Sequence, residues 1–274
     1  MNIFDDIIKG SLREDAPNGD ITTEYTVSED ETVSGSFVAK ADGVICGLAL
    51  IARTFELTGG IVSVDLKFND GDNVKKGDII AFIKGNAHTI LLGERTILNL
   101  IQRASGIATM TRATAFQVKD FKAKITDTRK TMPMLRVLDK YAVRVGGGYN
   151  HRFCLSDGVL IKDNHIKAAG SVTDAVLRAK EKAPHTIKVE VEVESLAMLN
   201  EAIEAGADIV MLDNMSNELM KEAVKIAAGR VLLEASGNMG EKNLRSVAET
   251  GVDIISIGAL THSVKALDIS LKLD

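Results

Sequence analysis

Aromatic side chains make up only 4% of the 274 residues, and tryptophan is absent. Proteins that stack the bases of single-stranded nucleic acid need several well-placed aromatic rings. Nucleic-acid binding generally also needs a basic domain, whereas this chain has a formal net charge of −5. The composition therefore predicts no nucleic-acid partner.

Cysteines and long apolar runs are equally scarce. Cys46 and Cys154 are the only two cysteines, too few for a disulfide scaffold or a cysteine zinc site, so we expect both to be reduced core thiols. No apolar run approaches the roughly 18 residues of a membrane span. The start of the chain lacks the basic flank of a signal peptide. We therefore expect a cytoplasmic protein with no membrane partner.

The modest net charge hides a segregation of charge along the chain. Residues 95–165 contain 13 basic and 5 acidic side chains, a net charge of +8, whereas the other 203 residues contain 20 basic and 33 acidic ones, a net charge of −13. Part of the basic segment has a simpler explanation: Arg136, Lys140 and Arg144 have helical spacing and are expected to form a solvated face.

The first part of the chain is typical of an antiparallel sheet. Short apolar runs separated by glycine- and aspartate-rich turns predict strands over residues 35–39, 43–47, 61–66 and 78–83. Apolar residues at helical spacing then predict a helix within residues 89–118. The turn at 71–78 resembles the hairpin of a biotinyl or lipoyl carrier, which keeps open the alternative of a non-enzymatic carrier, detectable as added mass on a lysine.

The second part changes to alternating strands and helices. Six short apolar runs, each followed by a helical stretch, predict a parallel sheet, with strands within residues 123–126, 158–161, 187–191, 208–212, 230–233 and 253–257. Six units are too few for a closed barrel of eight, so we expect an incomplete α/β barrel, with a flat doubly wound sheet as the alternative. The predicted domains are 1–110 and 111–274, with a last helix that packs back on the first domain.

The residues after these six strands are chemically ordered. Cationic groups follow the first two strands, carboxylates the third and fourth, and small polar turns the last two. Because the carboxyl ends of parallel strands converge, we expect a divided ligand site there. The late turns suit a phosphate, the carboxylates suit ribose hydroxyls or Mg²⁺, and the cations suit a carboxylated small molecule.

At these residues the sequence resembles the quinolinate phosphoribosyltransferase family, also called nicotinate-nucleotide pyrophosphorylase (carboxylating). The resemblance covers nearly the whole chain. It is carried by ordered motifs at residues 14–23, 94–99, 105–109, 127–131, 140–144, 146–148, 150–152, 161–165, 212–214 and 258–262. It implies an amino-terminal α/β sandwich with an antiparallel sheet and a carboxyl-terminal incomplete barrel of about six parallel strands.

The resemblance also implies an activity and its participants. The enzyme would be a pentosyltransferase of NAD biosynthesis that uses Mg²⁺, phosphoribosyl pyrophosphate and quinolinate to make nicotinate mononucleotide, pyrophosphate and CO₂. It would be a homodimer or a higher even oligomer whose subunits share their sites.

Site residues are carried over by motif position. Residues expected to line the quinolinate and pyrophosphate pocket are Arg95, Thr128, Arg129, Lys130, His151, Arg152 and Lys162, of which Arg95 would reach the partner subunit's site. Glu192 and Asp213 would serve the ribose and the metal, directly or through water. The 5′-phosphate would bind Ser236, Gly237, Asn238, Ile257, Gly258 and Ala259. The residues expected to take part in catalysis are Lys130, Lys162, Glu192, Asp213 and His151, with His151 or a lysine protonating the decarboxylated ring.

Two departures from the family pattern concern loop shape. Met134 stands where the family commonly has glycine after Pro133, and Cys154 stands where glycine is common after Arg152. Two other enzymatic interpretations stay open: a pyrophosphorylase-like homologue linked to molybdenum transport, and a Schiff-base barrel aldolase that uses Lys162.

Overall fold

The computed structural model describes residues 3–274, which divide into two compact units. The first unit contains the residues up to Arg112 together with Met132–Gly147 and Ser263–Asp274, and the second contains Ala113–Thr131 and Gly148–His262. Two segments thus join the first unit from later in the chain. We predicted a single boundary between two domains after residue 110. This prediction stays open, because the division by contacts also assigns residues 132–147 and 263–274 to the first unit.

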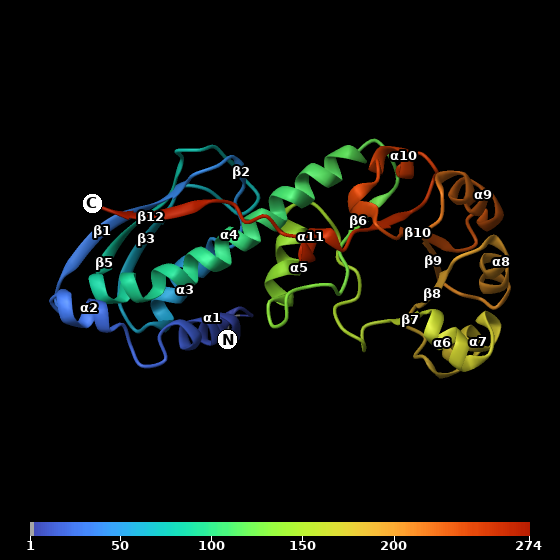
Figure 1. The fold of residues 1–274 in the computed structure, drawn as a ribbon, viewed down its shortest axis with the longest axis horizontal. Coiled ribbons are helices and arrows are strands. Elements are labelled where there is room, and N and C mark those ends of the chain that lie inside the picture. Colours follow the sequence, from blue (N-terminus) through green and yellow to red (C-terminus); the bar gives the residue numbers. More distant parts are fainter. Residues whose placement is uncertain (1–2) are drawn as a thin grey trace. The chain divides into compact units, whose positions relative to one another are not determined.

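The first unit is built on a four-stranded antiparallel sheet in the order β12-β1-β5-β3 (Figure 1). These strands are β1 (Thr32–Ala39), β3 (Val62–Leu66), β5 (Ile79–Asn86) and β12 (Ile269–Leu273), and a separate pair is formed by β2 (Gly43–Val44) and β4 (Asn73–Val74). The buried residues of β1 alternate, as expected for a sheet with one covered face. The antiparallel sheet that the turn-rich sequence predicted is confirmed.

Helices cover one face of this sheet (Figure 1). They are α1 (Asp5–Asp15), α2 (Ile21–Thr26), α3 (Ala49–Leu57) and the first part of α4 (Ala87–Gln117). The helix α5 (Arg136–Val145) also belongs to the first unit but does not cover the sheet. The long helix α4 contains no proline and matches the predicted helical region. In α5, Lys140 is only 2% exposed and Asp139 accepts two 2.8 Å hydrogen bonds from Arg103, so the expected solvated face is wrong at Lys140.

The end of the chain returns to the first unit as a strand. We expected a helix here, but residues 269–273 form β12, which pairs with β1 from Gly35 to Ala39. The approach to β12 is held by α4, where Leu267 N–H donates to Gln102 O (3.0 Å) and the Gln102 side chain donates to Ile269 O (2.6 Å). A short alternating run gives no local sign of which distant strand it will join.

The second unit is a six-stranded parallel sheet in the order β6-β11-β10-β9-β8-β7. Its strands are β6 (Lys124–Thr126), β7 (Val159–Ile161), β8 (Val189–Val193), β9 (Ile209–Asp213), β10 (Leu232–Ser236) and β11 (Ile254–Ser256). Neighbours follow chain order all round, except that β6 and β7 are not paired. A doubly wound sheet would reverse its order at a switch point, so the incomplete barrel is confirmed and the flat alternative is wrong.

Helices connect consecutive strands on the outside of the barrel (Figure 1). They are α6 (Asp163–Ala169), α7 (Val172–Lys182), α8 (Leu196–Glu204), α9 (Asn217–Ala227), the 3-10 helix η1 (Met239–Glu241) and α10 (Leu244–Ala248). The short helix α11 (Ala259–His262) follows β11, the last strand of this sheet in the chain. The hydroxyls of Ser171, Ser195 and Ser216 cap α7, α8 and α9 by accepting a backbone N–H. These serines mark where the chain leaves each strand-end loop. No helix among residues 3–274 is long and apolar enough to cross a membrane.

Met134 lies in a loop of the first unit and has a left-handed backbone, with φ +64°. Its side chain is 87% exposed and therefore gains almost no packing. A left-handed backbone costs a residue with a Cβ about 1–2 kcal/mol, which explains why glycine suits this position.

We predict that Met134→Gly raises the free energy of unfolding by about 0.5–1 kcal/mol, because relief of the left-handed strain exceeds the entropy that glycine adds to the unfolded chain. Chemical denaturation measures this. The control is Met132→Gly, since Met132 is also exposed but is not among the residues with positive φ. Equal destabilisation by both substitutions would contradict the explanation.

Candidate functional site

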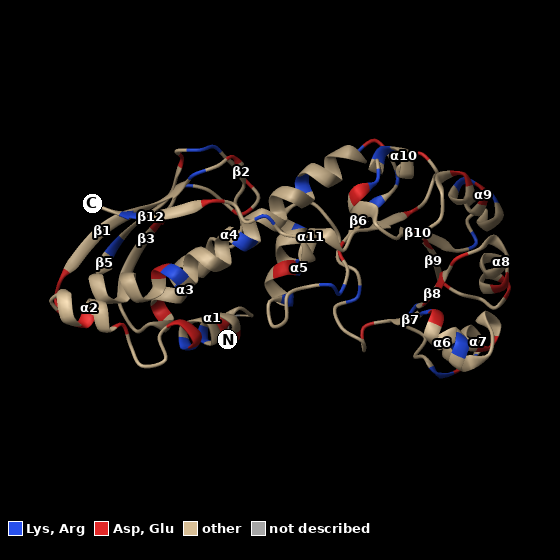
Figure 2. Ribbon diagram, viewed as in Figure 1, with Lys and Arg blue, Asp and Glu red and all other residues tan. Residues whose placement is uncertain are grey.

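The predicted site residues of the second unit lie where its strands end. Thr128, Arg129 and Lys130 follow β6, Lys162 follows β7, Glu192 lies near the end of β8, Asp213 ends β9, Ser236 ends β10, and Ile257 follows β11. Figure 2 shows acidic residues on β8 and basic residues beside β7. The structure therefore brings the predicted cations, carboxylates and small turns to one end of the sheet. Arg95 is exposed on α4 in the first unit and is not part of this cluster.

A buried aspartate organises the cationic side of the cluster. Asp127, which is fully buried, accepts the backbone N–H of His151 (2.8 Å) and the side-chain amide of Asn150 (2.6 Å). Tyr149 forms a parallel bridge with Thr126 of β6. The loop that contains Gly146, Gly147 and Gly148 and continues to Arg152 is therefore attached alongside β6, on the side where the barrel lacks a strand.

This attachment sets two arginines near one another. The Arg152 guanidinium donates to Gly158 O (3.1 Å). Burial lowers the pKa of Arg152, and the positive charge of Arg129 lowers it further. A carboxylate bound between these cations would offset both effects.

The carboxylate side is built by β8 and β9, which are neighbours in the sheet. Glu192 accepts a 2.8 Å salt bridge from Lys162, and Asp213 accepts a hydrogen bond from the Asn214 amide (2.8 Å). Lys162 is 48% exposed and ion-paired. A Schiff-base lysine needs a desolvated, neutral amine, so this geometry disfavours the aldolase interpretation.

Lys130 is held over the turn that follows β11. The Thr261 hydroxyl donates to Lys130 O (2.8 Å), and a Cβ built on Gly258 would lie 3.0 Å from Lys130 Cδ. A side chain at position 258 would therefore crowd the Lys130 side chain. The Ile257–Gly258–Ala259 turn thus lies against the cation that follows β6.

The turn after β10 uses left-handed backbone at Gly237 (φ +92°) and Asn238 (φ +50°). A Cβ on Gly237 would lie 2.2 Å from Asn214 Oδ1, so the amide that contacts Asp213 also packs against this turn. Consecutive residues with such backbone can present N–H groups to an anion. The Asn214 side chain therefore contacts both the end of β9 and the turn after β10.

Sequence reasoning missed two residues inside the barrel. Glu190 and Glu234 are 4% and 1% exposed, and both approach the His151 ring. Only Glu234 carried a signal, as a lone charged residue after an apolar run, because Glu190 belongs to an alternating series of charged and apolar residues that is typical of a half-exposed strand. Cys154 is half-buried, so the expectation that it is a core thiol is wrong, while Cys46 is buried and free as expected.

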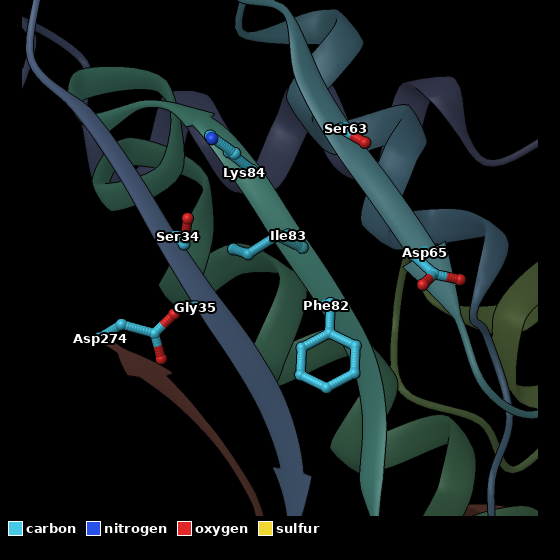
Figure 3. Close-up of a pocket in the computed structure, with 8 residues that line it drawn as sticks. All are labelled: Ser34, Gly35, Ser63, Asp65, Phe82, Ile83, Lys84 and Asp274. Carbon is cyan, nitrogen blue, oxygen red and sulfur yellow. The ribbon is translucent and has the colours of Figure 1, made fainter.

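A separate pocket lies on the sheet of the first unit and has a volume of about 240 Å³. Figure 3 shows Ser34 from β1, Phe82 and Lys84 from β5, and the terminal Asp274 around it. It contains none of the predicted site residues.

Comparison with known proteins supports the family resemblance that the strand-end residues indicated. Residues 20–105 match the family model of the quinolinate phosphoribosyl transferase N-terminal domain, and residues 107–272 match that of its C-terminal domain. The chain belongs to the quinolinate phosphoribosyltransferase family.

Individual relatives resemble the chain over almost its whole length. It is 47% identical to the probable nicotinate-nucleotide pyrophosphorylase [carboxylating] of Bacillus subtilis, covering 94% of this chain and 89% of that protein. The crystal structure of NadC from Streptococcus pyogenes is 45% identical, covers 99% of this chain and 96% of its own, and superposes with a TM-score of 0.93. The nicotinate-nucleotide pyrophosphorylase of Francisella tularensis is 43% identical with a TM-score of 0.91, at 98% and 95% coverage. The family's two-domain fold is therefore shared.

We predict that Gly237→Ala destabilises the protein more than Gly229→Ala. Both glycines have positive φ, but a Cβ at Gly229 meets nothing within 4 Å, whereas at Gly237 it collides with Asn214. The shared backbone penalty is about 1–2 kcal/mol, and Gly237→Ala should exceed it by about 1 kcal/mol or more because of overpacking. Thermal and chemical unfolding measure the difference. Equal losses would show that the contact with Asn214 does not constrain the turn.

Proposed function

We propose that the chain is a carboxylating nicotinate-nucleotide pyrophosphorylase. It transfers the phosphoribosyl group of phosphoribosyl pyrophosphate to quinolinate and releases pyrophosphate and CO₂, giving nicotinate mononucleotide for NAD biosynthesis. The observation that carries this proposal is the half-buried Arg129 and Arg152 pair, attached through Asp127 beside the strand-end carboxylates. Membership of the family supports it. The expected cytoplasmic location belongs to the same proposal.

Quinolinate, a dicarboxylate, would bind to the cationic side. Arg129 and Arg152 can each hold a carboxylate by paired hydrogen bonds, with Thr128 close to this cation cluster. Two fixed contacts would orient the pyridine nitrogen toward the ribose. Positioning of this kind lowers the barrier because the reactants no longer lose orientational freedom at the transition state.

Phosphoribosyl pyrophosphate would bind across the remaining strand ends. Backbone N–H groups in the 236–238 and 257–259 turns would receive its 5′-phosphate. Lys130 and Lys162 would contact the departing pyrophosphate. Glu192 and Asp213 would lie near the ribose, where their negative charge stabilises the positive charge that develops on the sugar as pyrophosphate leaves.

The pair Glu192 and Asp213 also fits Mg²⁺. This ion uses one or two protein carboxylates together with water and substrate phosphates, and the structure offers two half-buried carboxylates on adjacent strands. Bound there, Mg²⁺ would neutralise charge on the pyrophosphate. We also propose a homodimer or a higher even oligomer, in which the exposed Arg95 of one subunit reaches the site of its partner.

The direct test is to incubate the purified protein with quinolinate, phosphoribosyl pyrophosphate and Mg²⁺. We expect nicotinate mononucleotide, pyrophosphate and CO₂ in equal amounts, and loss of the reaction when EDTA removes Mg²⁺. Chromatography and trapping of labelled CO₂ measure the products. Faster turnover of nicotinate than of quinolinate would contradict the proposal.

We predict that Arg129→Ala raises KM for quinolinate by about 10- to 100-fold, the usual effect of losing a charged hydrogen bond. KM for phosphoribosyl pyrophosphate should change much less, because the arginine contacts the other substrate. Steady-state kinetics measure both values. Arg178→Ala, at an exposed arginine on α7, is the control and should have no effect. Unchanged quinolinate affinity in Arg129→Ala would exclude the carboxylate clamp.

A further inference from the structure

Three ionisable side chains meet inside the barrel of the second unit. His151 Nε2 lies 3.1 Å from Glu190 Oε2 and 3.6 Å from Glu234 Oε2. The two glutamates come from β8 and β10, which are separated in the sheet by β9. They approach the same ring because the sheet curves, so the cluster lies on its concave, inner face.

The hydrogen bonds of His151 determine where its proton sits. Its Nδ1 accepts the backbone N–H of Arg152 at 2.8 Å, so Nδ1 carries no hydrogen of its own in the neutral ring. Nε2 therefore carries the hydrogen and donates it to Glu190, the nearer carboxylate. A single N–H cannot serve both glutamates equally, which leaves Glu234 without this stabilisation.

Unsatisfied polar atoms surround the cluster. Glu190 Oε1 and Glu234 Oε1 are buried and have no hydrogen-bond partner among the described residues. The same holds for Thr126 Oγ1 on β6. Buried oxygens without partners are rare in proteins and indicate ordered water or a bound proton.

The charges facing Glu234 favour a neutral carboxyl. Burial raises the pKa of Glu234 to about 7, and the nearby Glu190 raises it while His151 and the Ser256 hydroxyl act in the opposite direction. Burial and the charge of Glu190 therefore favour a neutral Glu234 carboxyl near neutral pH.

A divalent cation fits this cluster less well, although the three ligand atoms lie within 4.8 Å of one another. A metal needs the lone pair of Nε2, but the hydrogen bond from Arg152 to Nδ1 leaves the hydrogen on Nε2. The same geometry that disfavours a metal suits a stored proton.

We propose that Glu234 is the proton source for the carbon of the pyridine ring that loses CO₂, and that Glu190 and His151 position the Glu234 carboxyl for this step. The proposal rests on the proposed function. It adds to that function a group that the strand-end motifs do not contain.

The step balances as follows for the bound nucleotide of quinolinate. The bond between the ring carbon and the carboxyl carbon breaks, its electron pair stays on the ring carbon, and CO₂ leaves. While this bond breaks, an ordered water gives the ring carbon a proton and takes one from the Glu234 carboxyl, whose oxygen keeps the O–H electron pair. Because protonation accompanies the cleavage, the rate of CO₂ release depends on the proton source. Solvent returns a proton to Glu234 after the product has left.

The test is a single-turnover experiment with Glu234→Gln, which keeps the shape of the side chain. We expect pyrophosphate release to stay within about twofold of the wild type and CO₂ release to slow by about 100-fold, the usual contribution of a general acid. The nucleotide that still carries both carboxylates should accumulate. Glu222→Gln, at an exposed glutamate of α9, is the control and should match the wild type in both steps.

The pH profile separates this role from a structural one. In the wild type, CO₂ release should fall as pH rises through about 7, because the neutral carboxyl is the proton source. In Glu234→Gln this decline should disappear. Wild-type rates of CO₂ release, or an equal loss of pyrophosphate and CO₂ release, would overturn the proposal.

Two further outcomes are distinguishable. A stoichiometric divalent metal in the purified wild type that is lost in Glu234→Gln would overturn the proton assignment in favour of a metal site. Failure of the wild type to release any pyrophosphate from phosphoribosyl pyrophosphate and quinolinate would instead overturn the proposed function. A wild type that makes nicotinate mononucleotide beside an unaffected Glu234→Gln would remove only the present inference.

Discussion

The carboxylate of Asp127 joins the end of β6 to the loop at residues 149–152, on the side of β6 that has no neighbouring strand. It directly follows β6, is fully buried, and accepts hydrogen bonds from both Asn150 and His151. The open side of the barrel between β6 and β7 is where this loop is attached. Arg129 is placed by the strand that leads into Asp127 and Arg152 by the loop that Asp127 holds, so one buried group sets both halves of the cationic site. Removing it would leave two donors unpaired in a buried place, which is costly.

Much of the fold could be predicted because its signals are local. Apolar runs bounded by turn residues correctly gave all six parallel strands, and proline-free helical spacing gave α4. The strand β12 could not be predicted in this way. Its five residues pair with β1, which lies at the opposite end of the chain, and nothing in a short run specifies a partner so distant. Burial of Lys140 was missed for a related reason, since its environment comes from tertiary packing.

The site residues in the loops after the strands could be predicted from the sequence, whereas those inside the strands could not. Residues in the loops could be assigned because parallel strands deliver their carboxyl ends to one place. The interaction of Lys162 with Glu192 could not, since it depends on the relative position of β7 and β8. Glu190 and Glu234 lie within strands, where charged residues are normally on a solvated face. Only the curvature of the sheet turns that face into an interior and brings the two side chains to one histidine.

Glu190 and Glu192 show how a single strand can supply two kinds of chemistry. Residues two apart on a strand point to the same side, separated by about 6.6 Å along it. Glu192 therefore lies near the mouth, where it meets the exposed Lys162, while Glu190 lies deeper and meets His151. At the mouth, the carboxylate of Glu192 pairs with a solvent-exposed cation, so a ligand can reach it. In the interior, the low dielectric makes a second charge beside Glu190 expensive, so the neighbouring carboxyl of Glu234 is the one that we propose to retain a proton.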